Sequence, residues 1–230
     1  LKNRDSDIAS EILSGNIPAF LRKMVPINFN QKINDTEYSI TYYVTSDYLA
    51  VGSNADYLYT PLAPGTAQMI ADSLSCILPT KKIVDQIYKN AETKLRPQPI
   101  KPSAKMTTVP VFLNHTDSIK NQLSARKIDR DKTNLLAGHK KDVIISNFIN
   151  KKPRNVVIYG WHKSIKNPIQ PVYGEHSDDW VDYSHGIRLI KDEILLNGNP
   201  VNIRKIMKDS SLWRLFCEEG VLKEVRYSVE

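Results

Sequence analysis

The order of helical and β-type patterns along the chain is the feature that most constrains its fold. Apolar residues recur at helical spacing within residues 5–24 and again after Pro64, whereas the later half consists of runs rich in β-branched and aromatic residues. These runs follow one another and do not alternate with helices, as the strands of a parallel sheet would. The sequence therefore predicts an α+β fold, with N-terminal helices and a β-hairpin followed by a mostly antiparallel sheet on which helices pack.

The N-terminal part is expected to contain two short helices and then the hairpin. Gly15 and Pro18 interrupt the helical pattern. The strand-like segments VPINFNQ (25–31) and YSITYYVTSDYLAVG (38–52) come next, and Asn34-Asp35 between them is typical of a turn.

Three further helices are expected after Pro64. The first ends near Cys76, the second has Thr80 as its N-cap, and the third spans about 112–127. Between the last two lies a segment with four prolines, about 94–110, which predicts an extended crossing segment packed on the surface. We expect residues 1–230 to form a single domain.

Four strands are expected in the later half, and two short helices are expected to close the chain. Asn197-Gly198 follows a β-type run and is a strong hairpin signal. The strands are predicted at DVIISNFI (142–149), NVVIYGWH (155–162), PIQPVY (168–173) and WVDYSHGIRLI (180–190), and the helices near 201–208 and 210–218.

Charge and cysteine content exclude several classes of protein. The net charge is +7, but the lysines and arginines are scattered and form no dense basic helix, so no nucleic-acid partner is predicted. Two cysteines are too few for a disulfide framework, and no apolar run approaches the length of a membrane span. The chain starts at Leu1 and not at Met, as expected after removal of a leader, so we expect an exported protein: periplasmic, secreted or lipid-anchored.

The strongest indication of chemistry is that four of the five histidines lie between His139 and His185. Histidine exchanges protons near neutral pH. Cys76 shortly precedes a predicted helix, whose positive N-terminus would lower the pKa of a thiol, so Cys76 is a candidate nucleophile with His139 or His185 as its base. The alternative is that Cys76 is a core residue between two apolar helices.

Candidate substrate-binding residues cluster in the same stretch. On an extended strand alternate residues share a face, so Tyr183 and His185 would line one pocket, and Arg188 would reach it after Gly186. The lone outlier His115 is expected on a helix away from this site.

Three more side chains are candidates for substrate binding: Trp161, His162 and His176. Trp161 could stack on a sugar or planar ligand, although aromatic residues on one strand face also form cores. His162, His176 and His185 carry atoms that zinc prefers, but no tight ligand motif recurs, so neither a metal nor a cofactor is predicted.

Several segments together carry a family resemblance across about residues 10–220. GNIPAFLRKMVPI, DYLAVGS, TAQMIADSL-C-LPTKKIVDQIY, MTTVPVF, GHKKDVIISN, VVIYGWH and WVDYSHGIRLI resemble an uncharacterised family of exported bacterial proteins. This resemblance implies one continuous domain and a secretory origin. A looser, fold-level likeness is to the NlpC/P60-type cysteine hydrolases, in which a cysteine and then a histidine occur in the order of Cys76 and His139, but the Asp-Cys helix start of those enzymes is missing.

These observations predict an exported hydrolase-like domain that acts on an amide, in cell-envelope peptide or a related polymer. The alternative function is a non-catalytic module that binds glycan or other cell-envelope material. Its contact surface would be aromatic: Trp161, Tyr173, Trp180 and Tyr183. In either case the partner is a cell-envelope polymer or a small polar ligand.

Overall fold

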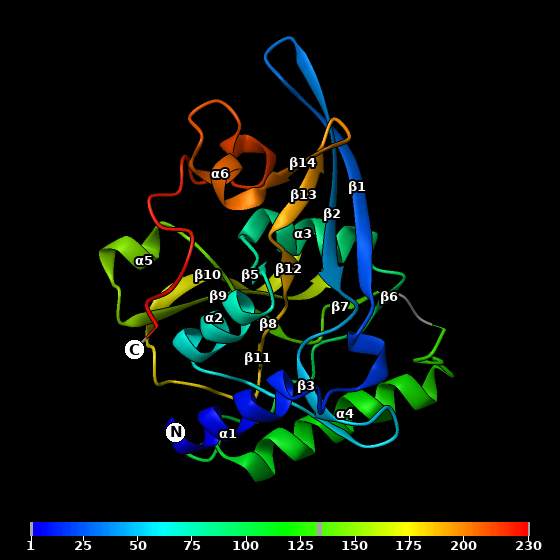
Figure 1. Ribbon diagram of the computed structural model, residues 1–230. Coiled ribbons are helices and arrows are strands. Elements are labelled where there is room, and N and C mark those ends of the chain that lie inside the picture. Colours follow the sequence, from blue (N-terminus) through cyan, green and yellow to red (C-terminus); the bar gives the residue numbers. More distant parts are fainter. Residues whose placement is uncertain (1, 133–134, 230) are drawn as a thin grey trace.

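The computed structural model describes residues 2–132 and 135–229, and it confirms the α+β prediction. Helices and strands are mixed along the chain, and most neighbouring strands are antiparallel (Figure 1). The strands form two larger sheets and two short pairs.

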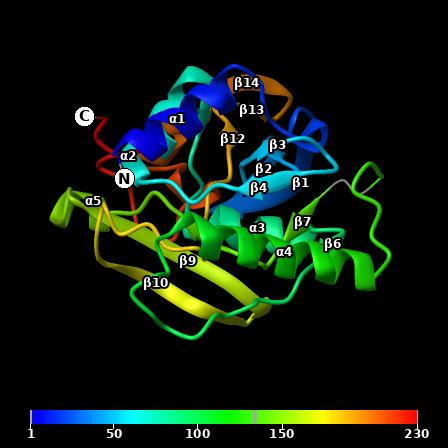
Figure 2. The same ribbon diagram turned by 90° about the horizontal axis from the view of Figure 1, so that it is seen from below.

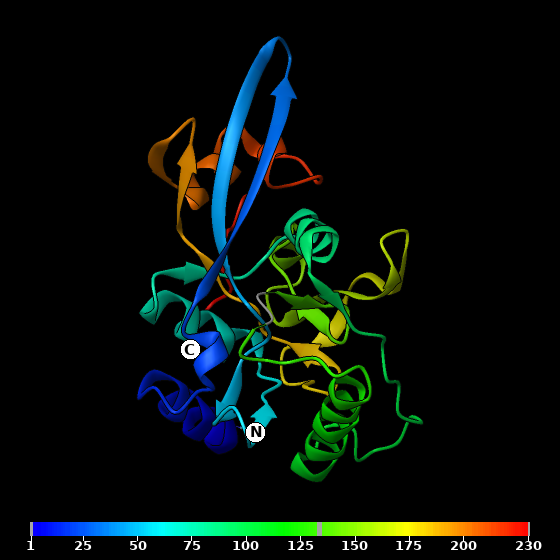
Figure 3. The same ribbon diagram turned by 90° about the vertical axis from the view of Figure 1, so that its right-hand side faces the viewer.

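The larger sheet contains the N-terminal hairpin. Its order is β14-β13-β2-β12-β5, with β1 also paired to β2. Asn34, in a left-handed conformation (φ 53°), makes the predicted turn between β1 and β2, and the hairpin tip extends well beyond the rest of the molecule (Figures 1 and 3). The strand bounds are Met24–Ile33 (β1), Thr36–Thr45 (β2), Cys76–Ile77 (β5), Ile190–Lys191 (β12), Glu193–Leu196 (β13) and Asn199–Asn202 (β14).

The second sheet has four strands in the order β10-β9-β8-β11. Strands β8, β9 and β10 are antiparallel neighbours, whereas β11 pairs with β8 in parallel. Their bounds are Lys141–Val143 (β8), Asn155–Ser164 (β9), Asn167–Ser177 (β10) and His185–Gly186 (β11). The short pairs are β3 (Ala50–Gly52) with β4 (Tyr57–Tyr59) and β6 (Thr93–Lys94) with β7 (Leu136–Ala137).

The helices lie around the sheets. Thr80 caps α3 as predicted, because its hydroxyl accepts from the backbone N–H of Ile83 at 3.3 Å. Figure 2 shows α1 against α2 on one side of the molecule, with β9 and β10 on the other. The bounds are Lys2–Leu13 (α1), Ala19–Leu21 (η1), Pro64–Ser73 (α2), Lys81–Asn90 (α3), Val109–Ala125 (α4), Phe148–Lys151 (α5), Ile203–Lys208 (α6) and Trp213–Leu215 (η2).

Two of the predicted strands are much shorter in the structure. The segment 142–149 leaves the sheet after Val143 and ends in α5. The segment 180–190 contains only β11 and the first residue of β12, because the Asp182 carboxylate accepts the backbone N–H of Ser184 at 2.7 Å and folds the chain into a turn. The expected alternation of faces across residues 180–185 is therefore wrong.

The apolar core joins the two larger sheets. Val44 on β2, Ile83 on α3 and Val157 on β9 belong to one contiguous buried cluster. A smaller cluster around Phe112, Trp161 and Tyr183 lies beneath the proline-containing crossing segment. No helix in the described part of the chain combines the length and apolar character needed to cross a membrane.

Candidate functional site

A fully buried carboxylate–imidazole pair lies where the two larger sheets meet. Asp47 lies two residues after β2 and His139 two residues before β8, and their Oδ1 and Nε2 atoms are 3.1 Å apart. The other Asp47 oxygen accepts the Tyr59 hydroxyl at 2.7 Å and lies 3.0 Å from Arg130 Nη2. Burial acts to raise the pKa of Asp47, but the charges of Arg130 and His139 outweigh it and hold that pKa well below its usual range.

The imidazole of His139 is held between two tyrosines. The ring centroids of Tyr48 and Tyr59 lie 5.0 and 5.4 Å from that of His139. Burial lowers the pKa of His139, and the Asp47 carboxylate opposes this shift. Neither ring nitrogen makes a hydrogen bond of good geometry with residues 2–132 and 135–229, although Nε2 lies 3.1 Å from Asp47 Oδ1, so the ring retains a nitrogen that can take up a proton.

Lys140, the next residue, places an amine in the same buried region. Its Nζ donates to the backbone oxygen of Tyr183 at 2.7 Å and lies 5.3 Å from the centre of the Tyr59 ring. Burial lowers the pKa of Lys140 to about 7, although the charges of Asp182 and Asp47 oppose the shift. An amine with this pKa can give or take a proton at neutral pH.

His115 lies beside this cluster, so the expectation that it would be distant is wrong. It is on α4 as predicted, but it is fully buried, with its ring centroid 4.8 Å from that of Tyr183. Burial and the charges of Lys140 and His139 lower its pKa to about 2. His115 comes three residues after the core residue Phe112 and therefore shares the inward face of the helix.

A second buried group fixes the strands around the cluster. The Tyr48 hydroxyl donates to Asp142 at 2.8 Å, and the Arg188 guanidinium lies over the Tyr48 ring at 4.2 Å. Arg188 donates to the backbone oxygens of Thr45 and Leu136, each at 2.8 Å, so its fully buried side chain ties segments together and does not face solvent. Burial raises the pKa of Asp142 to about 6, with Arg188 opposing the shift.

Gly186 allows this arrangement to pack closely. A Cβ atom at this position would lie 2.5 Å from Tyr48 Cδ1 and 2.7 Å from Lys140 Cβ. Glycine is therefore required for β11 to approach Tyr48 and Lys140.

His162 belongs to a second carboxylate–imidazole pair with Asp85. Its Nε2 lies 3.1 Å from Asp85 Oδ1, which also accepts the Tyr159 hydroxyl at 2.7 Å, while Lys81 donates to Asp85 Oδ2 at 2.9 Å. The His162 ring stacks on Tyr88 with 4.5 Å between centroids. Burial acts to raise the pKa of Asp85, but these hydrogen bonds lower it overall.

Asp85 was not among the site residues predicted from the sequence. Its position on the helix was the indication that could have drawn attention to it. Asp85 follows Lys81 by four residues, a spacing that places both on one helix face. Nothing local indicates that the same face meets β9 and His162, because that contact spans 77 residues.

Asp142 lies in the region between the two pairs. The position that a Cβ atom would take on Gly160 is 3.4 Å from His162 Nδ1 and 3.5 Å from Asp142 Oδ2. Smaller effects on the pKa of Asp142 come from the charges of His162 and Asp85. His162 and Asp142 therefore both lie close to Gly160, and Asp142 is hydrogen-bonded to Tyr48, whose ring packs against His139.

His185 is also buried in this region, as is Ser184. Its Nε2 lies 3.7 Å from Asp182 Oδ2, and the Ser184 hydroxyl donates to the other Asp182 oxygen. Burial lowers the pKa of His185 to about 4, with Asp182 opposing the shift. Tyr183 is held by the crossing segment, since its hydroxyl accepts the backbone N–H of Ile100 at 2.7 Å.

The structure does not bring Cys76 together with His139 or His185. Cys76 is on β5 of the larger sheet, whereas His185 is on β11 of the four-stranded sheet. Its thiol is buried in the core and donates to the backbone oxygen of Leu74 at 3.3 Å. Burial raises the pKa of Cys76 to about 12, the opposite of what a nucleophilic thiol needs. Cys217 is likewise a free, buried cysteine.

The remaining predicted substrate-binding residues divide into a buried and a surface group. Trp161 is buried, and its indole nitrogen donates to the backbone oxygen of His139 at 3.2 Å. His176 lies at the surface end of β10, stacked on the exposed Trp180 with 5.5 Å between ring centroids.

Comparisons with other proteins find no relative from which a function could be transferred. No protein-family model, curated protein or solved structure matches the chain. Within residues 2–132 and 135–229, no group of three or more His, Cys, Asp and Glu side chains is arranged to hold a metal ion. The likeness to exported bacterial proteins and to NlpC/P60-type hydrolases stays a prediction.

Proposed function

We propose that the chain is a hydrolase that cleaves an amide bond by acid–base catalysis at the buried cluster of Asp47, His139 and Lys140. The observation that carries this proposal is that Nε2 of the buried His139 lies 3.1 Å from the Asp47 carboxylate, while neither ring nitrogen makes a hydrogen bond of good geometry to the described residues. Lys140, with a pKa of about 7, supplies a second proton-transfer group next to it in the chain. Perturbed ionisable groups concentrated in one place are typical of catalytic sites.

The proposed reaction needs only water as the second reactant. His139 takes a proton from the water, whose oxygen attacks the amide carbon and forms the new C–O bond. The C–N bond then breaks, and the protonated form of Lys140 or of His139 gives a proton to the departing nitrogen. The products are a carboxylic acid and an amine, and Asp47 keeps the imidazole oriented and stabilises its charged form.

Substrate must reach the cluster past the crossing segment. Residues 95–103 form no helix or strand, and they are joined to Tyr183 by the backbone of Ile100. Met106 also accepts the backbone N–H of Tyr183 at 3.0 Å. We propose that displacement of this segment opens the site, as loop movements do in many enzymes.

The proposed substrate follows from the resemblance of this sequence to exported bacterial proteins. Cell-envelope peptide is the polymer that an exported amide hydrolase would meet. The raised pKa and burial of Cys76 favour direct attack by water over a thiol mechanism.

The test is digestion of purified peptidoglycan, with released peptides measured by mass spectrometry. We expect the His139→Gln variant to lose at least 100-fold in rate and the Cys76→Ala variant to keep the wild-type rate. Circular dichroism and thermal unfolding of both variants show whether each is folded. Full activity of the folded His139→Gln variant would overturn the proposal. Loss of activity in the folded Cys76→Ala variant would instead support a mechanism in which the Cys76 thiol is the nucleophile.

The alternative, a non-catalytic binding module, retains two of its four aromatic residues at the surface. Trp161 and Tyr183 are buried, whereas Tyr173 and Trp180 are 36 % and 37 % exposed. In the peptidoglycan experiment, a protein that binds the polymer in a pull-down but releases no product would favour this alternative.

A further inference from the structure

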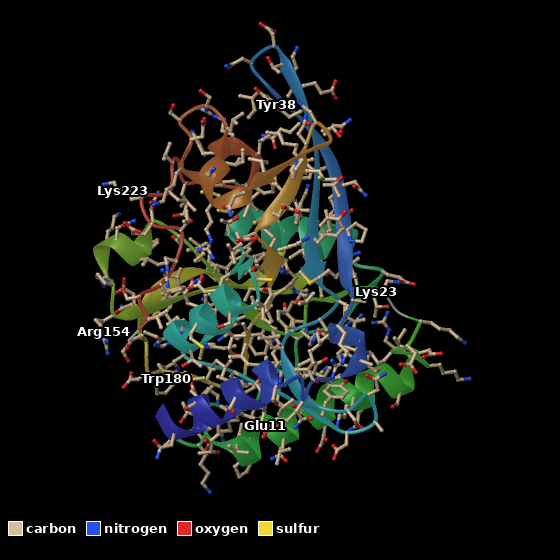
Figure 4. The ribbon with its side chains drawn as sticks, viewed as in Figure 1. Glu11, Lys23, Tyr38, Arg154, Trp180 and Lys223 are labelled. Atoms are coloured by element: carbon tan, nitrogen blue, oxygen red, sulfur yellow. The ribbon has the colours of Figure 1, made fainter. Side chains whose placement is uncertain are left out.

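A large groove opens on the side of the molecule away from Lys23. Its volume is about 700 Å³, within the range of sites for small organic ligands. It is lined by α1, by the first half of α2, by the segments around Arg154 and Asp178, and by residues 227–229 near the C-terminus. Figure 4 shows Arg154 and Trp180 on the same side of the molecule, with Lys23 on the opposite side.

The wall of the groove carries hydrogen-bonding groups. Asp178 and Asp179 provide carboxylates, and Thr66 on α2 provides a hydroxyl. The Asp178 backbone is fixed because its N–H donates to the Arg154 oxygen at 2.8 Å, and its carboxylate lies 3.1 Å from Arg154 Nε. Carboxylates held in place in this way can accept hydrogen bonds from ligand hydroxyls.

An aromatic surface follows directly on this wall. Trp180 is the residue after Asp179, and its backbone N–H donates to the Ser177 oxygen at 3.0 Å, which fixes the turn. The Trp180 and His176 rings are stacked, with an interplanar angle of 27°. Tyr173 continues the row, with its ring centroid 5.0 Å from that of His176. Three rings thus lie in a row that ends at Trp180, the residue next in the chain to Asp179 of the groove wall.

We infer that this groove and the Tyr173–His176–Trp180 surface bind an oligosaccharide. Aromatic rings provide flat apolar faces for the C–H face of a pyranose, and the carboxylates of the groove accept its hydroxyls. The groove wall combines these polar groups with apolar ones from Met69, Pro153 and Val229, a mixture that suits the hydroxyls and the C–H faces of a sugar. The inference rests on the proposed function, because it identifies the polymer that the hydrolase would cleave as one that carries glycan.

The experiment uses the side-chain N–H signals of the three tryptophans in NMR spectra of the full chain. Triacetylchitotriose is titrated into the protein, and the tripeptide Ala-Glu-Lys is titrated in parallel. We expect triacetylchitotriose to shift the Trp180 signal in a saturable manner, while the signals of the buried Trp161 and of Trp213 on η2 stay in place. The tripeptide should shift none of the three.

Two variants and a matched control sharpen the titration. Tyr173→Ala and His176→Ala, which keep the Trp180 signal, should each weaken binding by about tenfold, and Trp213→Phe should bind as the wild type does. No shift of the Trp180 signal with triacetylchitotriose, or a shift with the tripeptide alone, overturns the inference. If the Trp180 signal shifts in a saturable manner but the protein cleaves no peptidoglycan, the groove binds an oligosaccharide and the hydrolase proposal is rejected. If the protein cleaves peptidoglycan without this shift, the hydrolase proposal stands and the inference about the groove is rejected.

Discussion

The His139–Asp47 and His162–Asp85 pairs have the same Nε2–Oδ1 separation, 3.1 Å, but differ in what surrounds them. Asp47 and His139 are fully buried, and Arg130 adds a third ionisable group. Asp85 is 24 % exposed at its side chain and is bonded by Tyr159 and Lys81 as well as His162. Imidazole and carboxylate at hydrogen-bonding distance therefore do not by themselves define a catalytic site.

Both carboxylates are supplied with donors, and the pairs differ in their exposure to solvent and in what surrounds the imidazole. Asp85 is supplied with donors and remains in contact with water, so the His162–Asp85 pair has the character of a structural joint between α3 and β9. In the fully buried His139–Asp47 pair, neither imidazole nitrogen makes a hydrogen bond of good geometry to the described residues, and the next residue in the chain carries an amine whose pKa is about 7. Because burying such groups costs free energy, a functional role explains their presence better than stability does.

The largest expected difference between the pairs is in stability. Asp47→Asn removes a buried negative charge and leaves Arg130 and His139 without it, so we expect a loss of about 3–5 kcal/mol in the free energy of unfolding. Asp85→Asn should cost about 1–2 kcal/mol, because Asp85 is partly solvated. Urea unfolding monitored by circular dichroism measures both losses. Equal losses would show that complete burial does not make the His139–Asp47 pair differ in stability from the His162–Asp85 pair.

The next effect is a rise in stability with pH caused by Lys140. Its pKa is about 7 in the folded state and about 10.5 in the unfolded chain, so between these values the unfolded chain binds more protons. The free energy of unfolding should therefore increase by about 3 kcal/mol from pH 7 to pH 9.5. Lys140→Met is the control, since it removes the group and should abolish this increase. An increase of the same size in that variant would assign it to other groups.

The smallest effect separates the two tyrosine hydroxyls that bind carboxylates. Tyr48→Phe leaves the buried Asp142 without its hydroxyl donor and should cost about 2 kcal/mol. Tyr159→Phe leaves Asp85 with His162 and Lys81, so it should cost less than about 1 kcal/mol. Thermal unfolding at pH 7 measures the loss of stability in the two variants. A larger loss in Tyr159→Phe than in Tyr48→Phe would contradict the assignment of Asp142 to the fully buried region around His139.

Features of the fold that depend on neighbouring residues could be predicted from the sequence. Asn34, Thr80 and Asn197-Gly198 act through local backbone geometry and local hydrogen bonds, and each lies where the sequence placed a turn or a cap. The turn at Asp182 was missed because its apolar and aromatic neighbours are typical of a strand.

The site was predicted only in part, for a physical reason. His139 was recognised by its residue type, but its partner Asp47 is 92 residues away in the chain and is positioned by the larger sheet. His115 was placed on the correct helix, yet which helix face would meet Tyr183 depends on packing between distant segments. Pairings of this kind are set by tertiary structure and leave no spacing pattern in the sequence.

The most direct test of the central claim compares the two histidines as catalysts. Rates of amide cleavage in peptidoglycan fragments should fall at least 100-fold in His139→Gln. The His162→Gln variant should stay within about tenfold of the wild type, because His162 lies in the partly solvated pair. Equal rates in His139→Gln and the wild type, or a larger loss of rate in His162→Gln than in His139→Gln, would contradict the assignment of the His139–Asp47 pair as the catalytic centre.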